Sequence, residues 1–528
     1  MRIKHLATCA LSLGSLALCR GSRAALLRGG ALRASPAMMS TIPGSLGAAK
    51  EAPIALTSLA ITDSDTAPAE WSGDILVLPF FEADNSSSLV LSEDQAAVDS
   101  AMGGVLKELI EDHEFKGGAG ESAVLALPKS GGAAARRLGI VGMGKEDKFK
   151  PAGAAKFGVA ISGMAKAQKV KSMGVAMPSM STALQQTVLE AALLDLSPDQ
   201  RYKSAPGEKE NKLPPLTSLD VLGASLADGV VSRAKTVAAG VLLTKGLVAS
   251  PPNFLTPATM AETASALAEQ FPTLSLKVLE RAECEALGMG AYLGVAQGSF
   301  ETTPPKFIHL TYTPPAGVAP KKKVAIVGKG LTFDSGGYNI KAGAGSMIEK
   351  MKFDMGGAGA VLGAARAVAE LAPPVEAHFI IAACENMVSA EAFRPGDILT
   401  ASNGKTIEIL NTDAEGRVRG ALSRARADAR RSLSSARSRG RTALVVCADA
   451  RGATRLRPLA APVPLLPSPG VRRRVNPPLL PLARAVDAGR RARLRRQARR
   501  RRRHRGHCDP HRRVHRRPRP RLRRALHR

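Results

Sequence analysis

Short apolar runs alternate with amphipathic stretches along the chain, beginning at Trp71. The apolar runs occupy residues 73–81, 122–128 and 136–144, and the amphipathic stretches occupy residues 100–115 and 154–170. Strands alternating with helices in this way build a parallel or mixed sheet with helices on its faces. The pattern predicts an N-terminal α/β domain over residues 70–225, with a polar, proline-containing linker at residues 204–215.

A second α/β domain is predicted over residues 232–417. Its helices are expected at residues 232–245, 257–271 and 356–371, and its strands at residues 274–280, 305–314, 321–330 and 377–386. Thr256 is placed to cap the helix that begins at Pro257. The predicted fold class is α/β, with a smaller N-terminal domain and a C-terminal domain in which helices flank a central mixed sheet.

The strand at residues 321–330 leads directly to candidate chemistry. Its apolar run VAIVG is typical of a central strand buried on both faces, and the polar string LTFDSGGYNIK follows it. In open sheets of this class, ligands bind beyond the carboxyl ends of the strands. We therefore expect a site there.

Three short segments near these strand ends carry acidic and basic side chains. Taken singly, DSGG is a turn, Asp354 before a glycine-rich helix is an acidic cap, and NTDAEGR is a charged loop. We expect the segment KTIEILNTDAEGR to be extended, which places Asp413, Glu415 and Arg417 on one face. Four carboxylates gathered at one place would repel one another unless divalent cations neutralise them. The segments together predict a metal centre, formed by Lys329, Asp334, Asp354, Asp413 and Glu415.

The kinds of residue present restrict the kind of metal. Oxygen ligands with almost no histidine nearby favour Zn, Mn or Mg, and the His-Glu-x-x-His zinc motif is absent. The six cysteines have no paired short spacing, which excludes a thiolate zinc site and a disulfide framework. Hydrolases commonly hold two ions about 3.5 to 4 Å apart with shared carboxylates.

Several longer motifs resemble those of the leucyl aminopeptidase family. They are VGKGLTFDSGGYNIK, MKFDMGG, ACENM, RPGD and NGKTIEILNTDAEGR. The similarity extends back through SPPNFLTP and GMGAYLGVAQGS, and more weakly through the N-terminal domain, so that it covers roughly Trp71 to Arg417. The resemblance implies a two-metal enzyme that removes single residues from the N-termini of peptide substrates. It also implies a homo-oligomer, normally a hexamer, and two divalent ions (Mn or Zn), with bicarbonate as a further cofactor.

The resemblance also implies a role for each matching residue. Asp334 and Glu415 would bridge both ions, Asp413 would complete one ion site, and Lys329 (as the neutral amine) with Asp354 would complete the other. Lys341 would stabilise the oxyanion of the tetrahedral intermediate, and Arg417 would hold a bicarbonate that acts as general base. Met351 and Asn411 match positions that line the substrate pocket.

The charge of the chain is concentrated at one end. The 528 residues carry a net charge of +30, yet residues 1–417 hold 40 basic against 41 acidic groups. From Val418 onward there are 35 Arg and 4 Asp, with no Lys, Glu, Ile, Met, Phe, Tyr or Trp. We interpret residues 418–528 as a disordered low-complexity tail produced by a frame error or an unspliced intron, so that the second domain is incomplete. Within the tail, Ala443 to Asp449 is compatible with a stray strand.

Two other functions compete with the peptidase hypothesis. An authentic arginine-rich arm would bind nucleic acid electrostatically. An incomplete second domain would alternatively leave a catalytically inactive relative.

The first fifty residues resemble a targeting leader. They contain no Asp or Glu, and basic residues surround an apolar stretch from Leu6 to Cys19. That stretch is too short to span a bilayer, so we expect no membrane anchor. Residues 1–48 are therefore predicted to be a leader or disordered, and the destination to be organellar (plastid or mitochondrial). A wrongly assigned start codon ahead of a cytoplasmic enzyme is the alternative.

Overall fold

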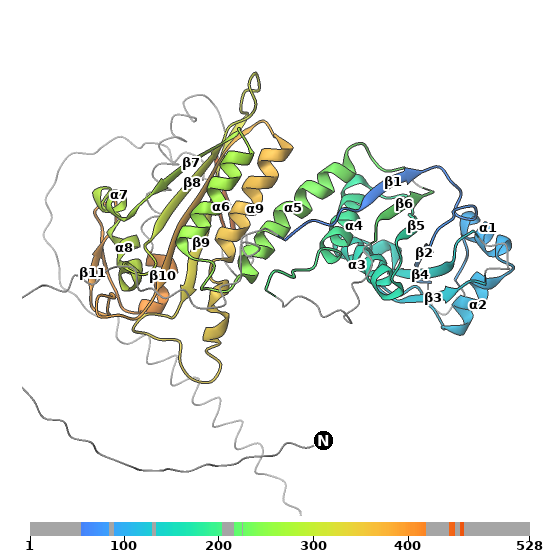
Figure 1. The fold of residues 1–528 in the computed structure, drawn as a ribbon, viewed down its shortest axis with the longest axis horizontal. Helices are drawn as coiled ribbons and strands as arrows, with labels where there is room; N and C mark the ends of the chain where they lie inside the picture. Colours follow the sequence, from blue (N-terminus) through green and yellow to red (C-terminus); the bar gives the residue numbers. More distant parts are fainter. Residues whose placement is uncertain are drawn as a thin grey trace, which may run out of the picture. The chain divides into compact units, whose positions relative to one another are not determined.

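The computed structural model describes most of the two predicted α/β regions (Figure 1). The described residues are 54–83, 89–128, 134–202, 216–223 and 225–416, with the backbone alone at residues 417–418, 443–448 and 455–458. The predicted leader, the whole linker at residues 204–215 and the rest of the arginine-rich tail lie outside them. No helix among the described residues combines the length and the apolarity that crossing a membrane requires.

The N-terminal region is built on a six-stranded sheet. Its strand order is β1 (Ala60–Ser64), β6 (Ser218–Leu222), β5 (Ser172–Ala176), β2 (Ile75–Phe81), β4 (Arg137–Gly144) and β3 (Ser122–Ala126). All neighbours are parallel except β3, which runs antiparallel to β4 at the edge. The apolar runs predicted as strands form β2, β3 and β4.

Helices cover both faces of this sheet because β2 is apolar on both sides. Ile75 and Val77 share a core with α3 (Pro151–Gln168) and α4 (Thr182–Asp195), whereas Leu76 and Leu78 share another with α1 (Glu93–Ala101) and α2 (Val105–Asp112). The sequence predicted one helix over residues 100–115. Two helices form instead, because Gly103 and Gly104 both take positive φ between α1 and α2.

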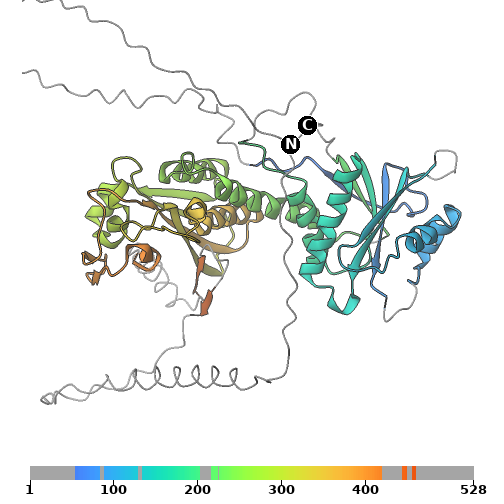
Figure 2. The same cartoon turned by 90° about the horizontal axis from the view of Figure 1, so that it is seen from below.

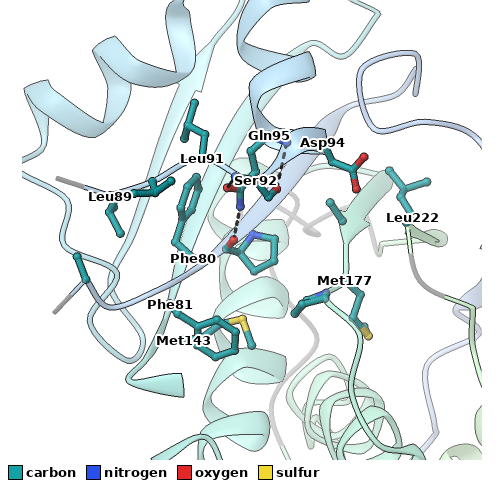
Figure 3. A pocket seen from close by; sticks show the side chains of 16 residues that line it. Phe80, Phe81, Leu89, Leu91, Ser92, Asp94, Gln95, Met143, Met177 and Leu222 are labelled. Carbon is teal, nitrogen blue, oxygen red and sulfur yellow. Dashed lines mark hydrogen bonds between the residues drawn. The ribbon is translucent and has the colours of Figure 1, made fainter. Parts of the chain in front are cut away.

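A cavity of about 510 Å³ lies where β2, β5 and β6 end. Its wall is mainly apolar, with Phe80, Leu91 and Met177 among the side chains drawn in Figure 3. Gln95 crosses its edge and donates a 2.8 Å hydrogen bond to the Pro79 carbonyl. None of the residues predicted to bind metal lines it, so this cavity is not the predicted metal centre.

The C-terminal region contains the second six-stranded sheet, which is mixed as predicted. Its order is β14 (Arg455–Pro458), β13 (Ala443–Ala448), β9 (Lys322–Asp334), β10 (Val375–Asn386), β8 (Lys306–Tyr312) and β7 (Leu274–Leu279). The strands β13, β9 and β10 are parallel, and the remaining pairs are antiparallel. The sheet therefore places the carboxyl ends of β9 and β10 at the same edge.

Helices flank both faces of this sheet. The helices α5 (Val230–Ala249), α6 (Pro257–Gln270) and α9 (Gly356–Leu371) pack on one face, and α7 (Arg281–Ala286) and α8 (Gly290–Ala296) on the other. Thr256 caps α6 as predicted, because its hydroxyl accepts a hydrogen bond from the Thr259 backbone N–H. The predicted fold class is confirmed.

Two strands lie within the segment predicted to be a disordered tail. β13 pairs in parallel with β9 over Ala443 to Ala448, and β14 pairs with β13 (Figure 2). The stray strand allowed for at Ala443 to Asp449 thus forms as β13 over Ala443 to Ala448, whereas β14 was not predicted. The run ALVVCA is apolar enough to add to the sheet, and it covers an edge of β9 that would otherwise expose unpaired backbone groups.

The helices α5 and α9 approach closely through glycines. A Cβ added at Gly240 would lie 2.6 Å from the Gly363 carbonyl oxygen, and one at Gly363 would overlap the Thr244 hydroxyl. Thr244 itself donates to the carbonyl oxygens of Gly240 and Gly359, at 3.1 Å each. Only a residue without a side chain fits at this crossing.

We expect Gly363→Ala to destabilise the protein by about 1–3 kcal/mol, the usual cost of overpacking. The matched control is Gly163→Ala in α3, where nothing lies within 4 Å of an added Cβ. That change should stabilise the fold by about 0.5–1 kcal/mol, since alanine favours helix over glycine. Urea unfolding of both variants measures the difference. Equal effects at the two positions would contradict the close helix contact.

Candidate metal centre

The strand β9 carries two of the predicted ligands. The sequence predicted that this strand would end near Lys329, but it continues to Asp334, so Lys329 lies inside the strand. The extension forms because Leu331 is buried and pairs with Cys384 of β10. Asp334 is the last residue of β9, and it is 3% exposed.

The loop after β9 turns back on itself and returns Lys341 to Asp334. Gly336 and Gly337 have φ values of +90° and +61°, which side chains other than glycine rarely adopt. A Cβ at Gly336 would also lie 2.5 Å from the Asn339 carbonyl oxygen. The Lys341 backbone N–H then donates to the Ser335 carbonyl at 2.9 Å. Glycine is therefore required for the reversal.

Lys341 is held by two carboxylates. Its Nζ lies 2.6 Å from Asp334 Oδ2 and also contacts Asp413 Oδ1. Burial opposes the charge of Lys341, but the hydrogen bonds to these carboxylates outweigh it and raise its pKa above the usual lysine value. Lys341 is therefore a permanent ammonium near neutral pH.

Asp354 approaches from the other side of the cluster. It follows the 3₁₀ helix Ile348–Phe353 and precedes α9, and its carboxylate forms an ion pair with Lys329. Burial raises the pKa of Asp354 to about 6, although Lys329 acts in the opposite direction and Asp334 and Glu415 add to the rise. Asp354 Oδ2 is buried, and it is the oxygen that contacts the Lys329 ammonium.

Asp413 and Glu415 come from a helical turn. The sequence predicted an extended segment here, but Thr412–Ala414 is a 3₁₀ turn and Glu415 begins α10 (Glu415–Val418). The turn starts because the Asn411 side chain accepts a 2.7 Å hydrogen bond from the Asp413 backbone N–H. The extended geometry is therefore wrong. Both carboxylates nevertheless reach the cluster.

The six predicted acidic and basic side chains form one continuous group. Oxygens of Asp334, Asp413 and Glu415 lie within 4.8 Å of one another. Lys329 Nζ is 2.8 Å from Glu415 and contacts Asp354, so it joins the fourth carboxylate to the group. The structure thus brings together all five predicted metal ligands and Lys341.

The group as it stands has an excess of negative charge. Four carboxylates face two ammonium groups, and the side chains of Asp334 and Glu415 are only 4% and 3% exposed. Buried, unbalanced charge is costly. Closely spaced carboxylate oxygens are the donors that hard divalent cations prefer. The residues present therefore fit divalent metal ions.

The other predicted site residues lie at the edge of this group. Met351 is half-buried in the 3₁₀ helix before Asp354, and its carbonyl accepts a 3.2 Å hydrogen bond from the Asp354 backbone N–H. Asn411 is exposed, and its side chain caps the turn that carries Asp413. The backbone of Arg417 lies in α10, and its side chain lies outside the described residues.

Two residues that the sequence analysis left without a role connect the ligand-bearing segments. Asn386 ends β10, and Thr412 begins the turn that carries Asp413; both are fully buried. Asn386 donates hydrogen bonds to Asp334 and to the Thr412 carbonyl. The signal available in the sequence was the polar pair of Glu385 and Asn386 after the apolar run FIIAAC.

Comparisons with known proteins agree with this geometry. Residues 242–427 match the family model described as cytosol aminopeptidase family, catalytic domain, and residues 77–206 match that of the family's N-terminal domain. The solved structure of a point mutant of tomato leucine aminopeptidase matches with a TM-score of 0.61 and 37% identity, over 70% of this chain and 71% of that one.

Curated relatives give the same assignment. The "Probable cytosol aminopeptidase" of Trichormus variabilis is 46% identical over 363 residues, covering 68% of this chain and 71% of the relative. The protein with the same description from Gloeothece citriformis is 48% identical over 351 residues, covering 66% and 69%. The predicted resemblance is confirmed, and this chain belongs to the cytosol aminopeptidase family.

Proposed function

We propose that this chain is a metal-dependent aminopeptidase that hydrolyses the N-terminal peptide bond of peptides by means of a water activated by two metal ions. The observation that carries the proposal is the buried group in which oxygens of Asp334, Asp413 and Glu415 lie within 4.8 Å of one another. Membership of the cytosol aminopeptidase family supports a peptidase that needs metal.

We assign the ligands as the family resemblance implies. Asp334 and Glu415 would be shared by two ions, Asp413 would complete one ion site, and Lys329 with Asp354 the other. The contacts support this division, because Lys341 lies with Asp334 and Asp413, whereas Lys329 lies with Asp354 and Glu415. Lys329 would bind an ion as the neutral amine. The ion would then replace the contacts that the Lys329 ammonium now makes with the carboxylates of Asp354 and Glu415.

Two divalent ions, when bound, would lower the pKa of a water molecule and polarise the carbonyl of the scissile bond. Lys341 keeps its proton and would donate a hydrogen bond to the oxygen that becomes negative in the transition state. Arg417 would hold a bicarbonate that accepts the proton of the attacking water. Met351 and Asn411 would line the pocket for the N-terminal side chain.

Several finer features belong to the same proposal. The ions would be Mn or Zn, since oxygen ligands with a single amine suit both. We also propose a homo-oligomer, a hexamer by resemblance to the family. The location would be organellar if the acid-free, basic first fifty residues act as a leader, and cytoplasmic if the start codon is wrongly assigned.

The test is hydrolysis of a pair of matched peptides by the full chain. A leucine-initiated peptide should lose its first residue in the presence of Mn²⁺ or Zn²⁺, and the same peptide with an acetylated N-terminus should remain intact. Removal of the ions with a chelator should abolish the reaction, and their return should restore it. Cleavage that persists after chelation, or cleavage inside the acetylated peptide, would exclude the proposed activity.

A further inference from the structure

We propose that Asn386 is a positioning residue that orients Asp334 for metal binding and ties together the two loops that supply the ligands. The inference rests on the proposed function. Asn386 lies at the carboxyl end of β10 and is 0% exposed. Its amide group is thus confined entirely to contacts inside the protein.

The Asn386 amide nitrogen donates two hydrogen bonds. One reaches Asp334 Oδ1 at 2.9 Å and the other reaches the Thr412 carbonyl at 3.0 Å. Asp334 belongs to β9, and Thr412 directly precedes Asp413 in the chain. A single NH₂ group therefore fixes the distance between two segments that are far apart in sequence.

These bonds give the two oxygens of Asp334 different surroundings. Oδ1 accepts from Asn386 and, at 3.0 Å, from the Gly336 backbone N–H, both of which are uncharged donors. Oδ2 faces the ammonium of Lys341 at 2.6 Å. Because one oxygen is held by neutral donors, the carboxylate cannot rotate freely and keeps its charge available to a cation.

The backbone of the two strands is arranged to place Asn386 here. Leu331 pairs with Cys384, so an unbroken register would set Phe333 opposite Asn386. A register shift between Cys384 and Asn386 sets Asp334 there instead. Such bulges commonly occur beside active sites, where they redirect a side chain.

The space around Asn386 allows few substitutes. Its Oδ1 would lie 2.8 Å from a Cβ added at Gly337, and this buried oxygen has no hydrogen-bond partner. The Asn386 backbone carbonyl also accepts two hydrogen bonds from Ser335, one from its hydroxyl at 2.7 Å and one from the Ser335 backbone N–H at 3.0 Å. Asparagine thus accepts at its backbone, donates from its side chain and fits against the glycine turn.

The experiment compares Asn386→Asp and Asn386→Leu with the wild type, using the full chain and Co²⁺ as the probe. Both variants keep the approximate size of the side chain but remove both N–H donors. We expect each to weaken Co²⁺ binding by about 10- to 100-fold, the usual effect of losing an outer-shell partner, and to change the visible absorption spectrum of the bound Co²⁺. Thermal unfolding of the metal-free proteins checks that they fold.

Asn403→Asp is the matched control, because Asn403 lies in the exposed turn between β11 (Ile398–Thr400) and β12 (Thr406–Glu408) and accepts from the Lys405 N–H. It should bind Co²⁺ like the wild type. Folded Asn386 variants with wild-type affinity and spectrum would overturn the positioning role. Tighter binding by Asn386→Asp alone would also overturn it, since added charge would then outweigh lost donors. A wild type that binds no Co²⁺ would instead refute the proposed function.

Discussion

Asp334→Ala should lower kcat/KM for a leucine-initiated peptide by about 10³-fold or more, equivalent to roughly 4 kcal/mol of lost transition-state stabilisation. Asp334 is almost fully buried, ends β9 and shares the space of Asp413 and Glu415. Because we assign it to both ions, its loss removes a ligand from each site at once. Metal-binding titration of the same variant should show greatly weakened uptake.

The control for this change is Asp397→Ala in the same region. Asp397 is a half-exposed acid whose carboxylate accepts a 2.8 Å hydrogen bond from the Arg394 backbone N–H. Its loss should leave kcat/KM within about twofold, since exposed charges contribute little. If Asp334→Ala kept wild-type activity while Asp397→Ala did not, the ligand assignment would be refuted.

Lys341→Met should lower kcat by about 10²- to 10³-fold, the usual effect of losing one donor to the transition-state oxyanion. The same change should strengthen metal binding. Lys341 contacts Asp334 and Asp413 as a cation, and a neutral side chain of similar length removes its competition for those carboxylates. Steady-state kinetics at saturating Mn²⁺, together with a Mn²⁺ titration, separate the two effects.

Lys405→Met provides the comparison for Lys341, because Lys405 is an exposed residue of the turn before β12. It should change neither kcat nor the affinity for Mn²⁺. A Lys341 variant that lost metal and activity in parallel would show that Lys341 supports the ion sites instead of the reaction. The proposed division of roles between the two lysines would then be wrong.

The sequence predicted the architecture well because its signals were local. The apolar run of β10 is long and buried on both faces, and Thr256 with Pro257 marks the start of α6 without reference to the rest of the chain. Carboxyl ends of parallel strands meet at one edge of a sheet, so Asp334 and its partners could be placed together before any coordinates.

The misses arose where tertiary contacts decide local structure. β9 continues past Lys329 because β10 offers it backbone partners, which the polar string DSGG did not indicate. The segment around Asp413 turns helical because the Asn411 side chain caps it. β13 was expected only as a stray strand, and it joins the sheet because β9 presents an open parallel edge. In each case the partner is distant in sequence or acts through one hydrogen bond.

The role of Asn386 was beyond sequence reasoning for a related reason. An asparagine at the end of an apolar strand predicts a turn or a cap. Only the register shift opposite Asp334 reveals that its amide faces a candidate ligand. Positioning contacts of this kind depend on a bulge, and a bulge leaves no periodic trace in the residue pattern.

The central proposal for this protein is that two divalent cations are held together by Lys329, Asp334, Asp354, Asp413 and Glu415. Equilibrium dialysis of the full chain against Mn²⁺ or Zn²⁺, followed by elemental analysis, measures this directly. We predict saturation at two ions per chain in the wild type and a marked loss at the same free metal concentration in Asp334→Ala. A folded wild-type chain that takes up no ions would contradict this proposal. An Asp334→Ala chain that still takes up two ions would contradict it as well.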